Sequence, residues 1–154
     1  LGCPVGSILV GGKDFIERAH RLRKGLGGGL RQVGVLAAAA IEALKVADAQ
    51  LLADHNHTRY VAEQLMSAEI NRGGVLSIDL NLVRTNILMV KISSNFCDAS
   101  TFAQRLAQEL PGSNIPRVLC LPVSDDTLRL VFHCDISDGD VDLLLERFKY
   151  VLSN

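Results

Sequence analysis

The feature that most limits the fold is the uneven distribution of strand patterns along the chain. Before the pair Gly73-Gly74, only residues 7 to 11, SILVG, form an apolar run typical of a buried strand. β-rich stretches begin after that glycine pair. A single strand cannot make a sheet, because its backbone N–H and C=O groups need a neighbour. The first half is therefore expected to be one piece of a larger structure, and the second half a small α+β unit.

Helical periodicity dominates the rest of the first half. Apolar residues recur at helical spacing over 13 to 24, and a triple glycine then interrupts the pattern. A second helix is expected from about Leu30 to Ala49, and a third from Leu51 to Met66. The alanine run at 37 to 40 suits a very close approach by a neighbouring helix.

The second half alternates strand and helix patterns. The expected elements are a strand at 87 to 92, a helix at 100 to 110, a strand pair at 118 to 122 and 127 to 133, and a last helix at 141 to 152. Ser137 is expected to be the N-cap of the last helix, with Asp138 and Asp140 in the first turn, where carboxylates are favourable.

Composition excludes several classes of function. With a net charge of −1, the chain gives no electrostatic case for binding nucleic acid or an anionic membrane, and no apolar run has transmembrane length. The cysteines are widely spread, without a C-x-x-C pair or a signal peptide pattern, which predicts reduced thiols in the cytoplasm and no metal site. His55 and His57 point in divergent directions on a helix, so we expect exposed residues rather than metal ligands.

The stretch RLRKGLGGGLRQ, residues 21 to 32, places three consecutive glycines between two groups of positive charge. Glycines that lead into a helix N-terminus let an anion approach its unpaired N–H groups. In the first turn of the expected second helix, Arg31 would be unfavourable by about 0.3–1 kcal/mol, and a bound phosphate or carboxylate would compensate. Arg23 and Lys24 add to the same field. The alternative is a flexible turn with solvated charges.

Two nucleotide motifs do not match this stretch. A Walker loop requires a lysine followed by serine or threonine after its last glycine, and no such pair is present. The dinucleotide fingerprint requires a preceding strand and a third glycine, whereas here a helix pattern precedes and Leu30 stands at that position. Composition does not say which anion the stretch would bind.

Three motifs occur in order: P-V-G-S, then R-x-R-K, then G-G-G-x-R-Q. With them, residues 1 to 45 closely resemble the middle of the low-specificity L-threonine aldolase family. The resemblance continues more weakly through RTNILMVKI (84 to 92) and LRLVFHCDIS (128 to 137). That family uses pyridoxal 5'-phosphate and has the aspartate-aminotransferase type of α/β fold. The resemblance implies that residues 1–69 end the large cofactor-binding domain and that 70–154 form the small α+β C-terminal domain.

The resemblance also implies roles for particular residues. Arg31 matches an arginine at the cofactor phosphate, contributed by a neighbouring subunit, and Lys24 matches a lysine near the same site. Arg129 matches the arginine that holds the α-carboxylate of the amino-acid substrate. The lysine that carries the cofactor would lie two residues before Leu1, so the chain is expected to supply no catalytic residue and to be inactive alone. The family is expected to form homo-oligomers, dimers or tetramers.

The pattern around Arg129 supports a binding role independently. Leu128, Leu130 and Phe132 are expected on one face of a strand, and Arg129 on the other. An arginine in an apolar strand is costly unless paired, and its planar guanidinium suits a carboxylate. The alternative is an edge-strand arginine in solvent. The stretch 111 to 127 fits the family pattern less well than its flanks.

For the intact protein, the resemblance implies a lyase that splits a β-hydroxy-α-amino acid of the threonine type into glycine and an aldehyde. One alternative is a truncated, non-catalytic fragment that keeps the small domain and the oligomer surface. Another is a related β-eliminating lyase of the same fold, which would form a different product.

Overall fold

The computed structural model describes all residues, Leu1 to Asn154, and groups them into two units, Leu1–Asp48 and Ala49–Asn154. The elements in chain order are α1 (Lys13–Gly25), α2 (Gly34–Leu65), β1 (Leu76–Ser77), the 3₁₀ helix η1 (Leu80–Leu82), β2 (Ile87–Ile92), α3 (Ala99–Ala107), β3 (Leu121–Pro122), β4 (Thr127–Val131) and α4 (Asp138–Ser153). The mixture of helices with a small antiparallel sheet agrees with the expected α/β class. The expected domain boundary at 69/70 stays a prediction.

The strand expected at residues 7 to 11 is absent. This segment is irregular and exposed, with Ile8 68% and Val10 84% accessible to solvent. An apolar run becomes a strand only when another strand accepts its backbone hydrogen bonds, and this segment pairs with no other part of the chain. The prediction was wrong because the pattern reports the residue types of a buried strand, not the presence of its neighbour.

The helices of the first unit bury little of their apolar surface. α1 has no buried residue, and α2 carries apolar side chains around its N-terminal half, including Val35, which is 77% exposed. A helix that is apolar all round is typical of a buried position. Residues 34 to 48 are mostly apolar and so resemble a buried helix in composition, apart from Glu42, Lys45 and Asp48.

The two helices expected between residues 30 and 66 form one continuous helix, α2. It begins at Gly34, later than expected, and ends at Leu65. No glycine or proline lies between these residues, so nothing in the backbone requires a break near residue 50. No helix of the chain is both long enough and apolar enough to cross a membrane.

The second unit contains a four-stranded antiparallel sheet with the order β1-β2-β4-β3. β2 and β4 are its central strands, and their register pairs Met89 with Arg129 and Leu88 with Leu130. The expected pairing of 118–122 with 127–133 is confirmed in the shorter form β3–β4. The expected strand at 87 to 92 is confirmed as β2.

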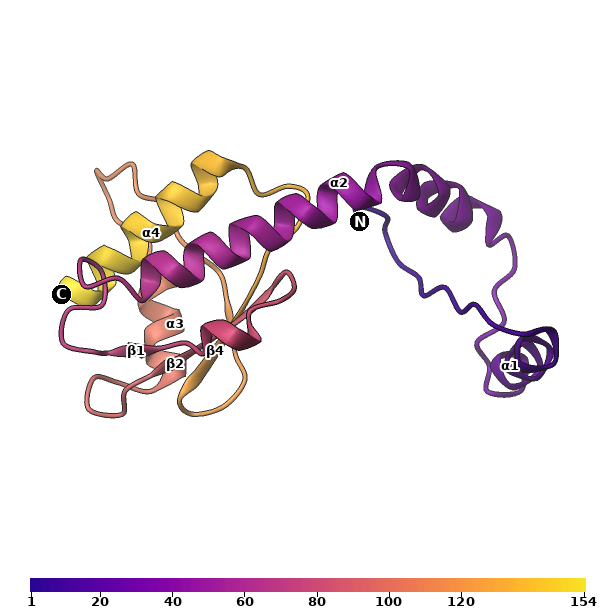
Figure 1. The fold of residues 1–154 in the computed structure, drawn as a ribbon, viewed down its shortest axis with the longest axis horizontal. Helices are drawn as coiled ribbons and strands as arrows, with labels where there is room; N and C mark the ends of the chain where they lie inside the picture. Colours follow the sequence, from indigo (N-terminus) through magenta and orange to yellow (C-terminus); the bar gives the residue numbers. More distant parts are fainter. The chain divides into compact units, whose positions relative to one another are not determined.

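The core of the second unit lies on one face of the sheet. Alternating residues of β2 (Leu88, Val90, Ile92) are buried, and the C-terminal half of α2, α3 and α4 contribute buried side chains to the same cluster. Figure 1 shows the C-terminal half of α2, α3 and α4 next to the sheet. Each fully buried large apolar side chain contributes about 1.5–3 kcal/mol to stability. The opposite face of the sheet carries the exposed residues of the same strands.

Polar contacts fix the helix ends of this unit. Ser137 accepts a hydrogen bond from the Asp140 N–H, and the Asp140 carboxylate accepts one from the Ser137 N–H, so the expected N-cap of α4 is confirmed as a capping box. The buried Arg147 guanidinium caps the C-terminal end of α3. Its Nε donates to the Leu106 carbonyl at 3.0 Å, and Nη2 donates to two further carbonyls at that helix end.

Candidate functional site

The glycine stretch first serves to terminate α1. Gly27 has φ +83°, a left-handed conformation that favours glycine. Its N–H donates to the Lys24 carbonyl at 3.2 Å, and the Gly28 N–H donates to the Arg23 carbonyl at 2.8 Å. These two bonds make a Schellman motif, which satisfies carbonyl groups that a helix C-terminus otherwise leaves unpaired. The position of Gly27 therefore follows from the way in which the helix ends.

The other two glycines lie close to Arg23 and Lys24, near the end of α1. A Cβ on Gly28 would lie 3.2 Å from the Arg23 carbonyl oxygen. A Cβ on Gly29 would lie 2.7 Å from Lys24 Cδ and 3.0 Å from Lys24 Nζ. The Lys24 side chain thus folds back along the loop, and its ammonium lies beside Gly29, two residues before Arg31.

Arg31 was expected in the first turn of the helix, but it lies in a turn before α2. The dipole penalty expected for an arginine inside the helix therefore does not apply. Gln32, the next residue, has φ 52° and is the one non-glycine residue with positive φ. Such a conformation costs about 1–2 kcal/mol for an L-residue, and it sets the direction in which the chain enters α2.

The loop has hydrogen-bond donors and positive charge without internal partners. The backbone N–H groups of residues 29 to 33 donate none of the chain's hydrogen bonds. Lys24 and Arg31 take part in none of its ion pairs, whereas Lys13 and Arg21 on α1 both lie within 4.0 Å of Glu17. A loop with free N–H groups and two uncompensated cations has the donor chemistry that a phosphate requires.

Arg129 stands on the exposed face of the sheet, in the middle of β4. Its neighbours Leu128 and Leu130 are buried on the opposite face, which confirms the expected alternation. Met89 on β2 and Leu121 on β3 pair with Arg129 from its two sides. Arg129 is therefore on a central strand, not on an edge, and it has no carboxylate partner.

The three expected site residues fall in different units. Lys24 and Arg31 belong to Leu1–Asp48, and Arg129 belongs to Ala49–Asn154. Within the first unit, the contact at Gly29 brings Lys24 to the loop that carries Arg31. Arg129 lies on the open face of the sheet in the second unit.

That open face also carries a hollow that the sequence did not predict. Met89 and Lys91 of β2 line it, together with Asp79 and apolar residues from the segments on either side. The alternating burial of β2 was the available signal, because it places Ile87, Met89 and Lys91 on the face of Arg129. Met89, which lines the hollow, is the cross-strand neighbour of Arg129. The hollow is therefore next to Arg129.

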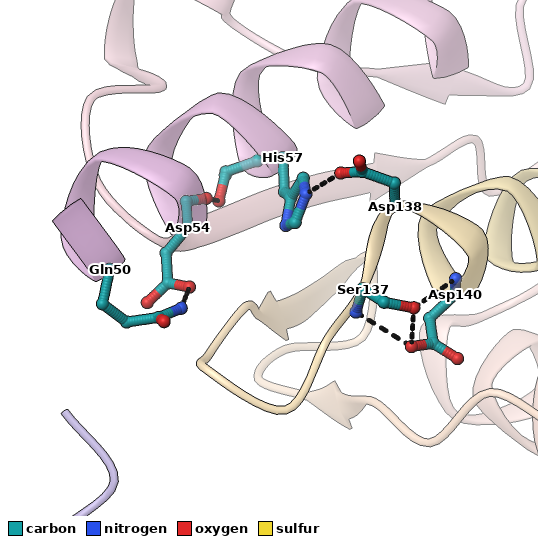
Figure 2. Close-up of polar contacts among 7 residues, drawn as sticks. Gln50, Asp54, His57, Ser137, Asp138 and Asp140 are labelled. Atoms are coloured by element: carbon teal, nitrogen blue, oxygen red, sulfur yellow. Dashed lines mark hydrogen bonds and ion pairs between the residues drawn. The ribbon is translucent and has the colours of Figure 1, made fainter.

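A polar cluster in the second unit involves His57, whose side chain is only 17% exposed. Its Nε2 lies 2.7 Å from Asp138 Oδ1, at the N-terminus of α4, as Figure 2 shows. The expectation that His57 is an exposed residue was wrong. Asp54 on the same helix is 2% exposed and accepts a hydrogen bond from Gln50 at 2.8 Å. The His57–Asp138 contact joins α2 to α4, whereas the Gln50–Asp54 bond lies within α2. No group of three or more possible metal ligands is formed.

The thiols of Cys97 and Cys120 are poorly suited to nucleophilic chemistry. All cysteines of the chain are free thiols. Burial raises the pKa of the Cys120 thiol to about 11, and burial also raises the pKa of Cys97. Both thiols are therefore protonated at neutral pH and are poor nucleophiles.

Comparison with known proteins identifies the family. The family model described as beta-eliminating lyase matches residues 1–95. The chain is 40% identical over 151 residues to a probable low-specificity L-threonine aldolase 2 of Arabidopsis thaliana, covering 98% of this chain and 39% of that protein. It is 39% identical over 137 residues to the low specificity L-threonine aldolase of Escherichia coli strain K12, covering 89% of this chain and 35% of that protein.

A third relative carries a different name. The chain is 31% identical over 160 residues to the alanine racemase TOXG of Cochliobolus carbonum, covering 99% of this chain and 36% of that protein. In all of these comparisons the chain spans 35% to 39% of the relative's length. The relatives therefore share this region while their names describe more than one reaction. On the match of the family model, the chain belongs to the beta-eliminating lyase family.

Proposed function

We propose that the protein to which this chain belongs is a pyridoxal-phosphate-dependent lyase that cleaves threonine-type β-hydroxy-α-amino acids to glycine and an aldehyde. The observation that carries the proposal is the 40% identity, over nearly the whole chain, to a probable low-specificity L-threonine aldolase. Because the chain spans 39% of that relative, the activity is proposed for the whole protein and not for these residues alone. The aspartate-aminotransferase type of fold and a homo-oligomeric assembly are part of the same proposal.

Lys24 and Arg31 would hold the phosphate of the cofactor. Both cations lack a carboxylate partner, and the loop between them has free N–H donors, so the residues present fit a doubly charged anion. In the assembled protein, Arg31 would serve the site of a neighbouring subunit. A cation contributed by a neighbour would make cofactor retention depend on assembly.

Arg129 would bind the α-carboxylate of the substrate amino acid. Its planar guanidinium donates two parallel hydrogen bonds, which fix the direction of a carboxylate as well as its position. When bound, the cofactor supplies an electron sink for the bond that breaks at Cα. Arg129 would hold the substrate so that the Cα–Cβ bond stands in the orientation in which it breaks, which is catalysis by positioning.

Three alternatives remain to be tested. The family description favours β-elimination, and the relative named as an alanine racemase favours racemisation at Cα. Both would use the same phosphate and carboxylate contacts. A non-catalytic protein that keeps only the binding residues is the third alternative.

Product analysis separates these reactions. The purified full-length protein, loaded with pyridoxal phosphate, is incubated with L-threonine, L-serine and L-alanine in parallel. Formation of glycine and acetaldehyde from threonine is the expected result. Pyruvate and ammonia from serine without glycine would indicate β-elimination, and D-alanine would indicate racemisation. Retention of the cofactor with no product from any substrate would indicate the non-catalytic alternative.

A further inference from the structure

Gly29 differs from the two glycines that precede it, because neither its backbone angle nor its N–H explains its presence. Its φ is not positive, so other residues could adopt its conformation. Its N–H takes no part in the Schellman motif, which uses Gly27 and Gly28. What distinguishes this position is its contact with Lys24, since a Cβ would lie 2.7 Å from Lys24 Cδ and 3.0 Å from Nζ and would displace the end of that side chain.

We propose that Gly29 is a positioning residue that places the Lys24 ammonium beside the Arg31 loop, where both cations bind one phosphate. The inference rests on the proposed function, which assigns these cations to the cofactor phosphate. Any side chain at position 29 displaces the end of Lys24, because real Cβ atoms do not approach other atoms to 2.7 Å. Since the end of a lysine side chain is flexible, the ammonium moves and the backbone stays.

The consequence is a selective loss of phosphate affinity. A charge-assisted contact of one cation with a phosphate corresponds to an affinity change of about 10- to 150-fold. The loss is expected for pyridoxal phosphate but not for pyridoxal, which has the same ring and no phosphate. A general disturbance of the fold would weaken both ligands alike, so the pair of ligands distinguishes positioning from structural damage.

The chain offers a matched control in Gly25. It is adjacent to Lys24 in α1, and a Cβ on it would meet nothing within 4 Å. The full-length protein is prepared as Gly29→Ala, Lys24→Ala, the double variant and Gly25→Ala. Equilibrium dialysis measures the dissociation constants of pyridoxal phosphate and pyridoxal for each, and circular dichroism confirms that each is folded.

Lys24→Ala is expected to weaken pyridoxal phosphate binding about 10- to 150-fold. Gly29→Ala is expected to weaken it in the same direction by a smaller, measurable factor, because the displaced ammonium stays tethered near the loop. The double variant should be no weaker than Lys24→Ala, because the atoms that the new Cβ would displace are then absent. Gly25→Ala should bind like the unsubstituted protein. Additive losses, equal losses for pyridoxal, or normal binding by Gly29→Ala would overturn the positioning role while leaving the lyase proposal intact. Failure of the unsubstituted protein to bind pyridoxal phosphate would overturn both.

Discussion

Substitution of Arg129 separates binding from folding, because its side chain stands on the exposed face of the sheet without a protein partner. Arg129→Ala removes no ion pair, no side-chain hydrogen bond and no residue of the core. Exposed substitutions of this kind change the free energy of unfolding by less than about 0.5 kcal/mol. We therefore expect the alanine variant to unfold at the same urea concentration as the unsubstituted full-length protein.

The effect on catalysis should be much larger. If Arg129 donates two charge-assisted hydrogen bonds of about 1.5–3 kcal/mol each to the substrate carboxylate, alanine loses about 3–6 kcal/mol. At about 1.4 kcal/mol for each tenfold change, kcat/KM falls by roughly 10²- to 10⁴-fold. Arg129→Lys restores the charge but not the planar pair of donors, so KM should still rise and kcat should still fall.

The assay is threonine cleavage by the full-length protein, with acetaldehyde as the measured product. Lys91→Ala is the matched control, because Lys91 is a second cation on the same face of the sheet. It should change kcat/KM by less than about threefold, since a cation at the surface contributes only a screened field. An equal loss in the two alanine variants would show that the field and not the guanidinium matters. Loss of cofactor with normal threonine kinetics after reconstitution would place Arg129 at the phosphate instead.

Substitutions at four further residues test the fold and the loop. Arg147→Ala leaves the Arg105 and Gln108 carbonyls without the guanidinium, while the Leu106 carbonyl still accepts from the Val118 N–H. It should lower the free energy of unfolding, measured in urea, by about 1–3 kcal/mol. A loss below about 0.5 kcal/mol would contradict the capping role. Ser137→Ala should cost about 1 kcal/mol. Hydrogen bonds from Ser137 lower the pKa of Asp140. The Asp140 carboxylate therefore stabilises the fold above the ordinary aspartate pKa, and this stabilisation is lost as the pH falls through the lowered pKa. The stability difference from Asp140→Asn should therefore vanish in acid. Gln32→Gly should be tolerated, whereas Gln32→Val should lower the melting temperature, because a β-branched residue is unfavourable at φ 52°.

The elements that the sequence predicted well are those whose determinants are local. The alternation of Ile87–Ile92 fixes which side chains of β2 face the core, and the Ser137 capping box fixes where α4 begins. The strand expected at residues 7 to 11 failed for the opposite reason, since a strand depends on a partner elsewhere in the chain. α2 was divided in two although no helix-breaking residue supports the division.

Local sequence patterns could not predict contacts between residues far apart in the sequence. Arg147 caps a helix through carbonyls that lie 39 to 42 residues earlier, and His57 binds Asp138 at a separation of 81 residues. Periodicity places a residue on a face of its helix, but it does not say which helix end or carboxylate faces it. For the candidate site, charge and glycine content indicated an anion, and family resemblance was needed to choose Lys24, Arg31 and Arg129.

The spacing of R-x-R-K and G-G-G-x-R-Q follows from the geometry of the loop. The Lys24 carbonyl accepts the N–H of Gly27, and the Lys24 side chain lies over Gly29, so one residue both ends the helix and places a cation. An insertion between Lys24 and Gly29 would keep the charges and the glycines but would break either the Schellman bond or the side-chain contact. Arg31 follows two residues later, before the backbone turns through Gln32 into α2. Helix termination and cation placement therefore constrain the same residues, which explains why a loop proposed to bind phosphate also has the form of a helix C-cap.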